Sequence, residues 1–181
     1  MTAKNTKRKR GDTMGKTIQT KIEGFTIRFA EEKDVPLILR FIKGLAEYEK
    51  LSHEVVATED ILRKSLFKQK AAEVIIGEYH NEPVGFALFF HNFSTFLGRP
   101  GLYLEDLFII PEMRGKGFGK TMLSFLAKIA VDRNYGRFEW WCLDWNQPSI
   151  EFYKSIGAVP MDEWTTFRVT GKELEDLAKE F

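Results

Sequence analysis

Residues 114–121, with the sequence RGKGFGKT, combine three glycines with three basic side chains. Glycine lets a backbone approach a ligand closely, because it has no side chain and tolerates positive φ angles. An apolar pattern of helical period begins at Met122, so this stretch is predicted to lie at the start of a helix. Successive backbone amides in that position attract an anion. The stretch is therefore predicted to bind a phosphate group.

The spacing of the glycines does not fit the two common nucleotide-binding motifs. A P-loop has a glycine five residues before its final Gly-Lys-Thr, but here Arg114 occupies that position. A dinucleotide-binding fingerprint needs a third glycine where this sequence has Lys120. The remaining pattern is Arg114-x-x-Gly117-x-Gly119, between a predicted strand and a predicted helix.

The helices and strands around this stretch must position it. Their predicted order indicates an α/β (α+β) fold with strands clustered in the middle of the chain. Asp34 is predicted to cap the first helix, with Pro36 in its first turn. Apolar runs and alternation predict strands, and a period of 3.6 predicts helices. The predicted strands cover residues 25–29, 73–79, 84–91, 102–110, 137–143 and 165–169; the predicted helices begin at residue 34 and cover 58–68, 122–130, 148–155 and 172–180.

The glycine pattern resembles the acetyl-CoA pyrophosphate loop of the GNAT N-acetyltransferases. Three further segments are similar to the diamine acetyltransferases of that superfamily, the spermidine/spermine and thialysine N-acetyltransferases. These segments are 38–49 (ILRFIKGLAEYE), 103–109 (YLEDLFI) and 145–158 (WNQPSIEFYKSIGA), and the resemblance covers about residues 25–180. It implies the GNAT fold, which is a mixed, mostly antiparallel central sheet, splayed at the acetyl-CoA site and flanked by helices.

Acetyl transfer from a thioester to an amine needs a base and benefits from an acid. An alkylammonium, with a pKa near ~10.4, cannot attack until it loses a proton, and a departing thiolate, with a thiol pKa near ~8.5, is helped by protonation. By the resemblance, Glu105 is the base, acting through a water, and Tyr153 is the general acid. Asp106 is a further candidate at the amine. Adjacent strand residues point to opposite faces, so Glu105 and Asp106 share a site only if the strand bulges.

The resemblance also implies two sets of binding residues. Acetyl-CoA is expected to serve as the acetyl donor, held largely by backbone amides, with Arg114 or Lys116 adding positive charge at the pyrophosphate. The implied acetyl-CoA-binding residues are Leu107, Phe108, Ile109, Arg114, Gly115, Lys116, Gly117, Phe118, Gly119, Lys120, Asn146 and Ser149. The implied substrate-binding residues are Tyr48, Glu49, Glu105, Asp106, Glu139, Trp140 and Trp141.

The amino-acid composition bears on disulfides, metal sites and cellular location. The single cysteine, Cys142, and three widely spaced histidines predict neither a disulfide nor a metal site. No apolar run approaches the ~18 residues of a membrane span, and a signal-peptide core is lacking, so a cytoplasmic location is expected.

Residues 1–20 are predicted to be a disordered basic extension, followed by a single domain over residues 21–181. Residues 1–10 hold five basic residues and no acid, which leaves 22 basic against 26 acidic residues elsewhere. That acidic body suits a small cationic substrate, whereas nucleic-acid binding would depend on the KRKR of residues 7–10 alone.

The leading hypothesis is therefore an acetyl-CoA-dependent N-acetyltransferase. It would move the acetyl group directly, in a ternary complex, to a primary amine of a diamine, polyamine or lysine analogue. Other amine classes stay open, namely an aminoglycoside or a protein lysine or N-terminus, as does a non-catalytic acetyl-CoA-binding module. The presence of both Glu105 and Tyr153 favours an enzyme, because a pure binder needs neither. The family resemblance further implies a homodimer.

Overall fold

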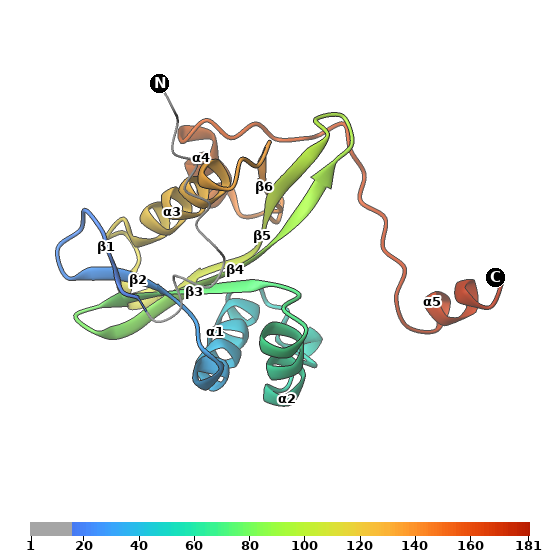
Figure 1. Ribbon diagram of the computed structural model, residues 1–181, viewed down its shortest axis with the longest axis horizontal. Coiled ribbons are helices and arrows are strands. Elements are labelled where there is room, and N and C mark those ends of the chain that lie inside the picture. Colours follow the sequence, from blue (N-terminus) through green and yellow to red (C-terminus); the bar gives the residue numbers. More distant parts are fainter. Residues whose placement is uncertain (1–15) are drawn as a thin grey trace, which may run out of the picture. The chain divides into compact units, whose positions relative to one another are not determined.

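The computed structural model describes residues 16–181, which divide into two compact units, one ending at Trp141 and one beginning at Cys142 (Figure 1). Each unit is described by itself, and a single domain over residues 21–181 stays a prediction. Residues 1–15 of the basic extension, including the KRKR cluster, lie outside the described residues. The predicted disorder of residues 1–20 is wrong at its end, because Ile18–Gln19 form strand β1 and pair with the next strand.

The first unit is built on one six-stranded sheet in the order β1-β2-β3-β4-β5-β6. Every neighbouring pair is antiparallel except β5 and β6, which are parallel. This arrangement confirms the mixed, mostly antiparallel sheet. The strands after β1 are β2 (Phe25–Phe29), β3 (Glu73–Tyr79), β4 (Glu82–Ser94), β5 (Arg99–Ile109) and β6 (Phe138–Trp140).

Helices cover both faces of this sheet: α1 and α2 lie on one face and α3 on the other (Figure 1). On the α1 face, Phe41 of α1 packs against Phe86 of β4 and Phe108 of β5. On the other face, Phe118 of α3 stacks on Phe25 with ring centroids 4.2 Å apart. The helices are α1 (Val35–Tyr48), α2 (Glu59–Leu62), which continues as a π-helix (Arg63–Lys68), and α3 (Phe118–Asp132); short 3-10 turns cover Glu32–Asp34, Ser52–Glu54 and Pro111–Met113.

The second unit contains α4 (Gln147–Ser155) and α5 (Gly171–Ala178), close to the helices predicted there. The strand predicted at 165–169 is wrong, because that segment has no regular structure. Its alternating pattern has no neighbouring strand to pair with among the described residues, and Phe167 is 90% exposed. A strand needs such a neighbour for its backbone hydrogen bonds. The strand predicted at 137–143 is also shorter, ending at Trp140.

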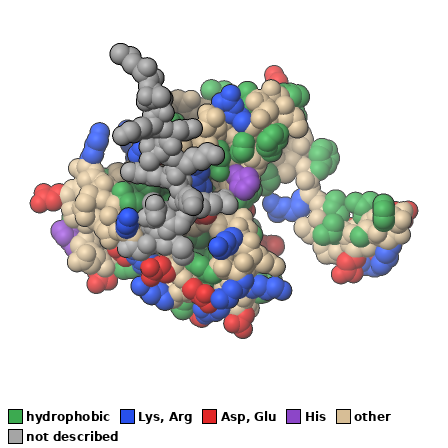
Figure 2. All heavy atoms as spheres, viewed as in Figure 1, with side chains coloured by type: hydrophobic (Ala, Val, Ile, Leu, Met, Phe, Trp, Pro, Cys, Tyr) green, Lys and Arg blue, Asp and Glu red, His purple; other side chains and the backbone are tan. Residues whose placement is uncertain are grey.

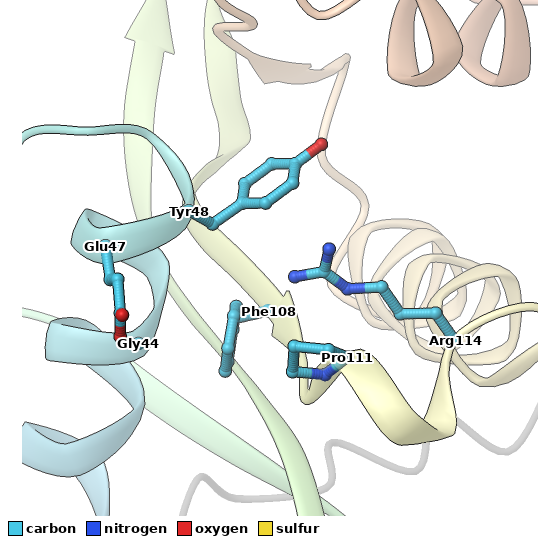
Figure 3. Close-up of a pocket in the computed structure, with 6 residues that line it drawn as sticks. All are labelled: Gly44, Glu47, Tyr48, Phe108, Pro111 and Arg114. Atoms are coloured by element: carbon cyan, nitrogen blue, oxygen red, sulfur yellow. The ribbon is translucent and has the colours of Figure 1, made fainter.

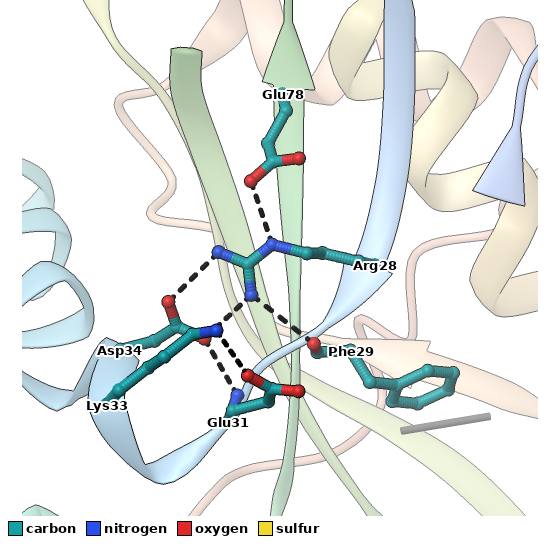
Figure 4. A network of polar contacts seen from close by, with 6 residues as sticks. All are labelled: Arg28, Phe29, Glu31, Lys33, Asp34 and Glu78. Atoms are coloured by element: carbon teal, nitrogen blue, oxygen red, sulfur yellow. Dashed lines mark hydrogen bonds and ion pairs between the residues drawn. The ribbon is translucent and has the colours of Figure 1, made fainter. Parts of the chain in front are cut away.

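A network of charged groups fixes the start of α1 against the sheet (Figure 4). The guanidinium of Arg28, on β2, donates two hydrogen bonds to Asp34, at 2.7 and 2.9 Å, and its Nε donates to Glu78 at 2.8 Å. The backbone amide of Glu31 also donates to Asp34, at 2.7 Å. Asp34 therefore precedes α1 as predicted, but its carboxylate bonds Arg28 and Glu31 instead of capping α1.

Surface charge over α1 and α2 is mixed in sign (Figure 2). Acidic and basic side chains alternate there, which is not the single-sign stripe that a nucleic-acid-binding face presents. In the part of the chain that the structure describes, no helix is long and apolar enough to cross a membrane.

Asp34→Asn should lower the free energy of unfolding by about 2–3 kcal/mol, because it removes one of the two charged partners of the partly buried Arg28. Lys33→Gln is the matched control in the same turn. Its ion pair with Glu31 is exposed, so its loss should cost less than about 1 kcal/mol. Urea denaturation at pH 7 measures both values, and equal losses would contradict the role given to the Arg28–Asp34 pair.

The effect of Asp34→Asn on stability should depend on pH. Burial alone would raise the pKa of the Asp34 carboxyl, but the hydrogen bonds from Arg28 and from the Glu31 amide hold it below its ordinary value. The stabilisation is therefore present above the unfolded-state pKa and is lost as pH falls through the lower folded-state value. The stability difference between wild type and Asp34→Asn should be full at pH 7 and should shrink below pH ~4.

Candidate active site

A β-bulge places an extra residue in β5 at the predicted catalytic carboxylate. Leu88 of β4 faces Asp106, whereas the next residue, Phe89, faces Leu104. Glu105 is thus the extra residue between them, the usual arrangement of a bulge. Cross-strand partners share a face, so Asp106 lies with Leu88 on the α1 side and Leu104 lies on the other side. The bulge required for Glu105 and Asp106 to share a site is present.

The sheet opens directly after this bulge. β6 pairs with β5 only from Leu102 to Leu104, while β5 continues to Ile109. The backbone amide of Ile110 donates to Val84 on the β4 side, so by alternation the amide of Phe108 also faces β4. The amides of Leu107 and Ile109 therefore face the side where β6 has ended. These two amides can bind the carbonyl groups of an extended ligand. The amide of Phe108 was predicted to do the same, but it faces β4, and the Phe108 ring packs on the α1 face.

Three carboxylates lie near this opening. Burial, followed by the negative charges of Glu105 and Glu49, raises the pKa of Asp106 to about 7. Burial also raises the pKa of Glu49, which ends α1 as its C-cap. Glu105 itself is exposed in the bulge. Like charges brought together at a partly buried place attract a cation strongly, so the arrangement suits an ammonium group.

The glycine-rich stretch forms the turn that leads into α3. Gly115 and Gly117 have φ angles of 76° and 82°, and Gly117 is the N-cap of α3. Its carbonyl accepts a hydrogen bond from the Thr121 hydroxyl. The Phe118 side chain is buried, so this residue offers a ligand only its backbone amide. Positive φ angles at the start of a 15-residue helix fit the predicted anion site.

The charged side chains of this turn point in different directions. Lys116 Nζ lies 3.2 Å from Met113 Sδ and 5.7 Å from the Tyr79 ring centroid. Arg114 reaches the other way: its Nε donates to the Ile109 carbonyl at 3.0 Å, and its guanidinium lies 4.4 Å from the centroid of the Tyr48 ring (Figure 3). Arg114 therefore approaches the end of α1, and its implied place at the pyrophosphate stays a prediction.

A pocket of about 320 Å³ lies where Arg114 meets α1 (Figure 3). Gly44 lets α1 pack closely against β5 beside this pocket, because a Cβ there would come within 2.9 Å of the Phe108 ring. Sequence reasoning missed this pocket, although a glycine inside a helical pattern often marks a close contact. The lining residues are Gly44, Glu47, Tyr48, Phe108, Pro111 and Arg114.

The predicted substrate residues on β6, and Trp141 directly after it, contact other residues of the sheet. The Glu139 carboxylate accepts a hydrogen bond from Asn92 at 2.8 Å and lies 2.8 Å from Nε of Arg137. Trp140 packs edge-on against Phe138, and Trp141 packs edge-on against Tyr103 of β5, with ring centroids 5.9 Å apart. Trp141 remains exposed and offers an aromatic face, whereas Glu139 already has two partners.

In the second unit, three predicted residues share one side of α4. Asn146 is buried and is the N-cap, and its carbonyl accepts the amide of Ser149 at 3.1 Å. Tyr153 follows Asn146 by seven residues, about two helical turns, so it lies on the same side. Because α4 belongs to the second unit, the predicted approach of Tyr153 to the acetyl-CoA thiol stays a prediction.

The described residues contain no group of three or more His, Cys, Asp or Glu side chains arranged to hold a metal ion.

The family model described as Acetyltransferase (GNAT) family matches residues 41–158. The chain belongs to the GNAT acetyltransferases. Its relatives include the thialysine N-epsilon-acetyltransferase of Sus scrofa, 37% identical over 166 residues that cover 84% of this chain and 96% of that protein. The L-ornithine N5-acetyltransferase NATA1 of Arabidopsis thaliana is 33% identical and covers 84% of this chain and 87% of its own length.

A solved structure supports the GNAT fold. An integron cassette protein from the mobile metagenome of V. cholerae superposes with a TM-score of 0.72 at 30% identity, covering 86% of this chain and 98% of its own. The six-stranded sheet and flanking helices of this chain are thus the fold of a GNAT enzyme, and its reaction is acetyl transfer.

Asp106→Asn should change the pH dependence of catalysis. With a pKa of about 7, Asp106 gains its charge as pH rises through neutrality, and the charged form attracts an ammonium. Wild-type kcat/KM for an amine should therefore show a rise near pH 7 that Asp106→Asn lacks. Initial rates between pH 5.5 and 9 measure this, and an unchanged rise would contradict a role for Asp106 at the amine.

The same variant should be more stable than wild type in alkaline buffer. The folded-state pKa of about 7 lies above the ordinary carboxyl value of 3.8, so wild-type stability falls as pH rises between those values. Asp106→Asn removes that loss, so its advantage in melting temperature should be larger at pH 8 than at pH 4. Glu82→Gln, at an exposed carboxylate, is the control and should show no such difference.

Proposed function

We propose that this GNAT enzyme transfers the acetyl group of acetyl-CoA to a primary amine of a small cationic substrate, a diamine, polyamine or lysine analogue. The observation that carries the proposal is the position of Glu49, Glu105 and Asp106 beside the open edge of β5. There, a cation-attracting group of carboxylates lies next to backbone amides that no strand uses. The names of the thialysine and ornithine acetyltransferase relatives agree with an acceptor of this size.

In this proposal, one set of residues binds acetyl-CoA and another set acts on the amine substrate. The amides of Leu107 and Ile109 hold carbonyl groups along the opening, and the amides of the turn at Gly115 and Gly117 hold the pyrophosphate. Acetyl-CoA supplies the activated acyl group when bound. Glu105, exposed at the bulge, removes the ammonium proton through a water, because an amine with a pKa near ~10.4 is otherwise protonated. Tyr153 donates the proton that the departing thiolate takes up.

Direct transfer in a ternary complex is the simpler route for this chain. A covalent acyl-enzyme would need an activated nucleophile with a base beside it. The only cysteine in the sequence is Cys142, and its thiol donates to the carbonyl of the next residue, Leu143, at 3.7 Å, a contact in which the sulfur keeps its proton. Initial-rate patterns that intersect support the ternary complex, whereas parallel patterns would indicate a covalent intermediate.

Two other functions stay open beside this one: acetylation of another amine class, such as an aminoglycoside or a protein lysine or N-terminus, and a non-catalytic acetyl-CoA-binding module. A binding module has no use for the carboxylates at the bulge, which favours the enzyme. We also propose a cytoplasmic location, on the composition of the sequence.

A homodimer is proposed from the family resemblance. Sedimentation velocity at micromolar concentration should give about twice the 21.0 kDa mass of the chain. A single species of 21.0 kDa would contradict the proposal.

The direct test of function is release of free CoA thiol from acetyl-CoA across a panel of amines. The panel contains diamines, polyamines, lysine and ornithine analogues, aminoglycosides and a lysine peptide. Turnover is expected with the small aliphatic amines, and acetyl-CoA binding without turnover on any amine would favour the binding module.

Tyr153→Phe should lower kcat by roughly 10²–10⁴-fold, the usual range for general acid catalysis, while acetyl-CoA binding changes little. Phe152→Leu, at the preceding position, controls for changes in the packing of α4. Stopped-flow turnover and calorimetric binding of acetyl-CoA measure the two effects. A fully active Tyr153→Phe enzyme would remove Tyr153 as the acid.

A further inference from the structure

A group of polar side chains joins β4 to β6 across the strand between them. Asn92 Nδ2, on β4, donates a hydrogen bond to Glu139 Oε2, on β6, at 2.8 Å. These two strands are not neighbours, because β5 lies between them (Figure 1). Two strand spacings amount to about 10 Å, so only side chains that cross over β5 can join β4 to β6.

The crossing takes place over Gly101 of β5. Asn92 faces Gly101 in the β4–β5 ladder. Glu139 faces Tyr103, two residues further along β5. Cross-strand partners share a face, as do residues two apart on one strand, so these side chains lie on one face of the sheet. A Cβ at Gly101 would come within 2.5 Å of Asn92 Oδ1 and within 2.7 Å of Arg137 Cγ. The crossing therefore depends on a residue without a side chain.

Arg137, directly before β6, makes a second connection between the same two strands. Its Nε lies 2.8 Å from Glu139 Oε2, and its Nη2 donates to the carbonyl of Phe93, on β4, at 3.4 Å. Asn92, Arg137 and Glu139 together form the strand clamp. Its centre is the Glu139 carboxylate, which both other side chains contact.

The hydrogen bond of Asn92 to Glu139 comes with a loss of stability elsewhere in the same amide. Asn92 Oδ1 is buried and accepts no hydrogen bond from a described residue. The reverse orientation of the amide would set this oxygen against the Glu139 carboxylate. A buried acceptor without a partner lowers the stability of the fold. Stability alone therefore does not account for the strand clamp.

Few other contacts fix the register of β6 on β5. β6 is three residues long and pairs only with Leu102, Tyr103 and Leu104. A slip by two residues would keep every side chain on its face, so alternation does not exclude it. Trp141 would then take the place of Glu139. Its indole has a donor but no acceptor for the Asn92 amide, so the strand clamp selects the observed register.

The register of β6 affects the acetyl-CoA side of the site more than the amine side. A slip of two residues moves β6 by about 7 Å along β5 and changes where the sheet opens. It also moves the point from which the chain continues to α4, which has Asn146 as its N-cap. The carboxylates at the amine side, Glu49, Glu105 and Asp106, lie at the end of α1 and on β5, so they would stay in place.

We infer that Glu139 is a positioning residue and not a ligand of the amine. With Asn92 and Arg137 it holds β6 in the register that opens the sheet for acetyl-CoA. This inference rests on the proposed function. Only molecules with β6 in this register bind acetyl-CoA, so their fraction sets the apparent Kd.

Asn92→Asp tests the strand clamp, because it sets a second carboxylate against Glu139. Acetyl-CoA should bind about tenfold more weakly, as expected for a lost hydrogen bond to a charged group. KM for the best acceptor of the amine panel should stay unchanged, since the carboxylates at the amine side do not move. Isothermal titration calorimetry measures the affinity, initial rates give KM, and thermal melting checks folding.

The double variant Asn92→Asp with Glu139→Gln exchanges donor and acceptor. The amide introduced at position 139 can donate to the carboxylate introduced at position 92, so acetyl-CoA affinity should return to within about twofold of wild type. Glu139→Gln alone keeps an acceptor for Asn92 and should weaken acetyl-CoA binding less than Asn92→Asp does. It should leave KM for the amine unchanged.

Asn134→Asp is the matched control. It makes the same change of charge at an exposed position shortly before β6 and should change neither constant. Asn92→Ala removes the amide without adding a charge. It should also weaken acetyl-CoA binding, and it replaces Asn92→Asp in the comparison if that variant does not fold.

Three results would overturn the inference. The first is wild-type affinity for acetyl-CoA in folded Asn92→Asp or Asn92→Ala, which would leave the strand clamp with a structural role alone. The second is a double variant that binds acetyl-CoA no more tightly than Asn92→Asp. The third is a Glu139→Gln enzyme with a raised KM for the amine and unchanged acetyl-CoA affinity, which would assign Glu139 to the substrate.

The proposed function can fail without deciding this inference. If no amine is acetylated, the calorimetric affinities for acetyl-CoA still test the strand clamp by the first two criteria. If wild type does not bind acetyl-CoA at all, both the proposed function and the inference are wrong.

Discussion

The end of the β5–β6 ladder at Leu104 is the constraint on which the candidate site depends. A ladder that continued to Ile109 would use the amides of Leu107 and Ile109 for strand pairing and leave none for a ligand. The bulge at Glu105 follows directly and shifts the register by one residue, so that Asp106 and Phe108 turn to the α1 face. The end of the ladder therefore opens the sheet edge, while the bulge exposes the Glu105 carboxylate and brings a second carboxylate under α1.

Helix α1 connects this opening to a rigid anchor. Arg28 and Asp34 fix its N-terminal end to β2, and a helix of 14 residues spans about 21 Å, so its other end reaches β5. That end carries Glu47, Tyr48 and Glu49. Close approach to β5 is possible because Gly44 has no Cβ to meet the Phe108 ring. The position of Glu47, Tyr48 and Glu49 beside β5 thus depends on packing at both ends of α1.

Much of this arrangement followed from the sequence, because periodicity and turn chemistry are local. The strands around Ile75 and the helix after Gly117 were predicted near their observed ends, and the need for a bulge at Glu105 followed from two adjacent carboxylates. Directions decided by tertiary contacts were not predictable. The amide of Phe108 faces β4 because of strand register, and Asp34 turns to Arg28 because β2 passes beside it. The segment at 165–169 has a strand's alternation, but a strand also needs a neighbour, which no local pattern reveals.

The position of Arg114 explains how the carboxylates remain available. An arginine within reach of Asp106 or Glu49 would form an internal ion pair, lower their pKa values and remove the attraction for an ammonium. Here the guanidinium is instead held over the Tyr48 ring and bonded to the Ile109 carbonyl, and the pKa values of Asp106 and Glu49 are raised. Repulsion among these carboxylates lowers the stability of the fold. Such a loss of stability is common at sites that bind a charged ligand. Within residues 16–181 no cation lowers these pKa values, and a substrate ammonium is the cation that the proposed reaction brings there.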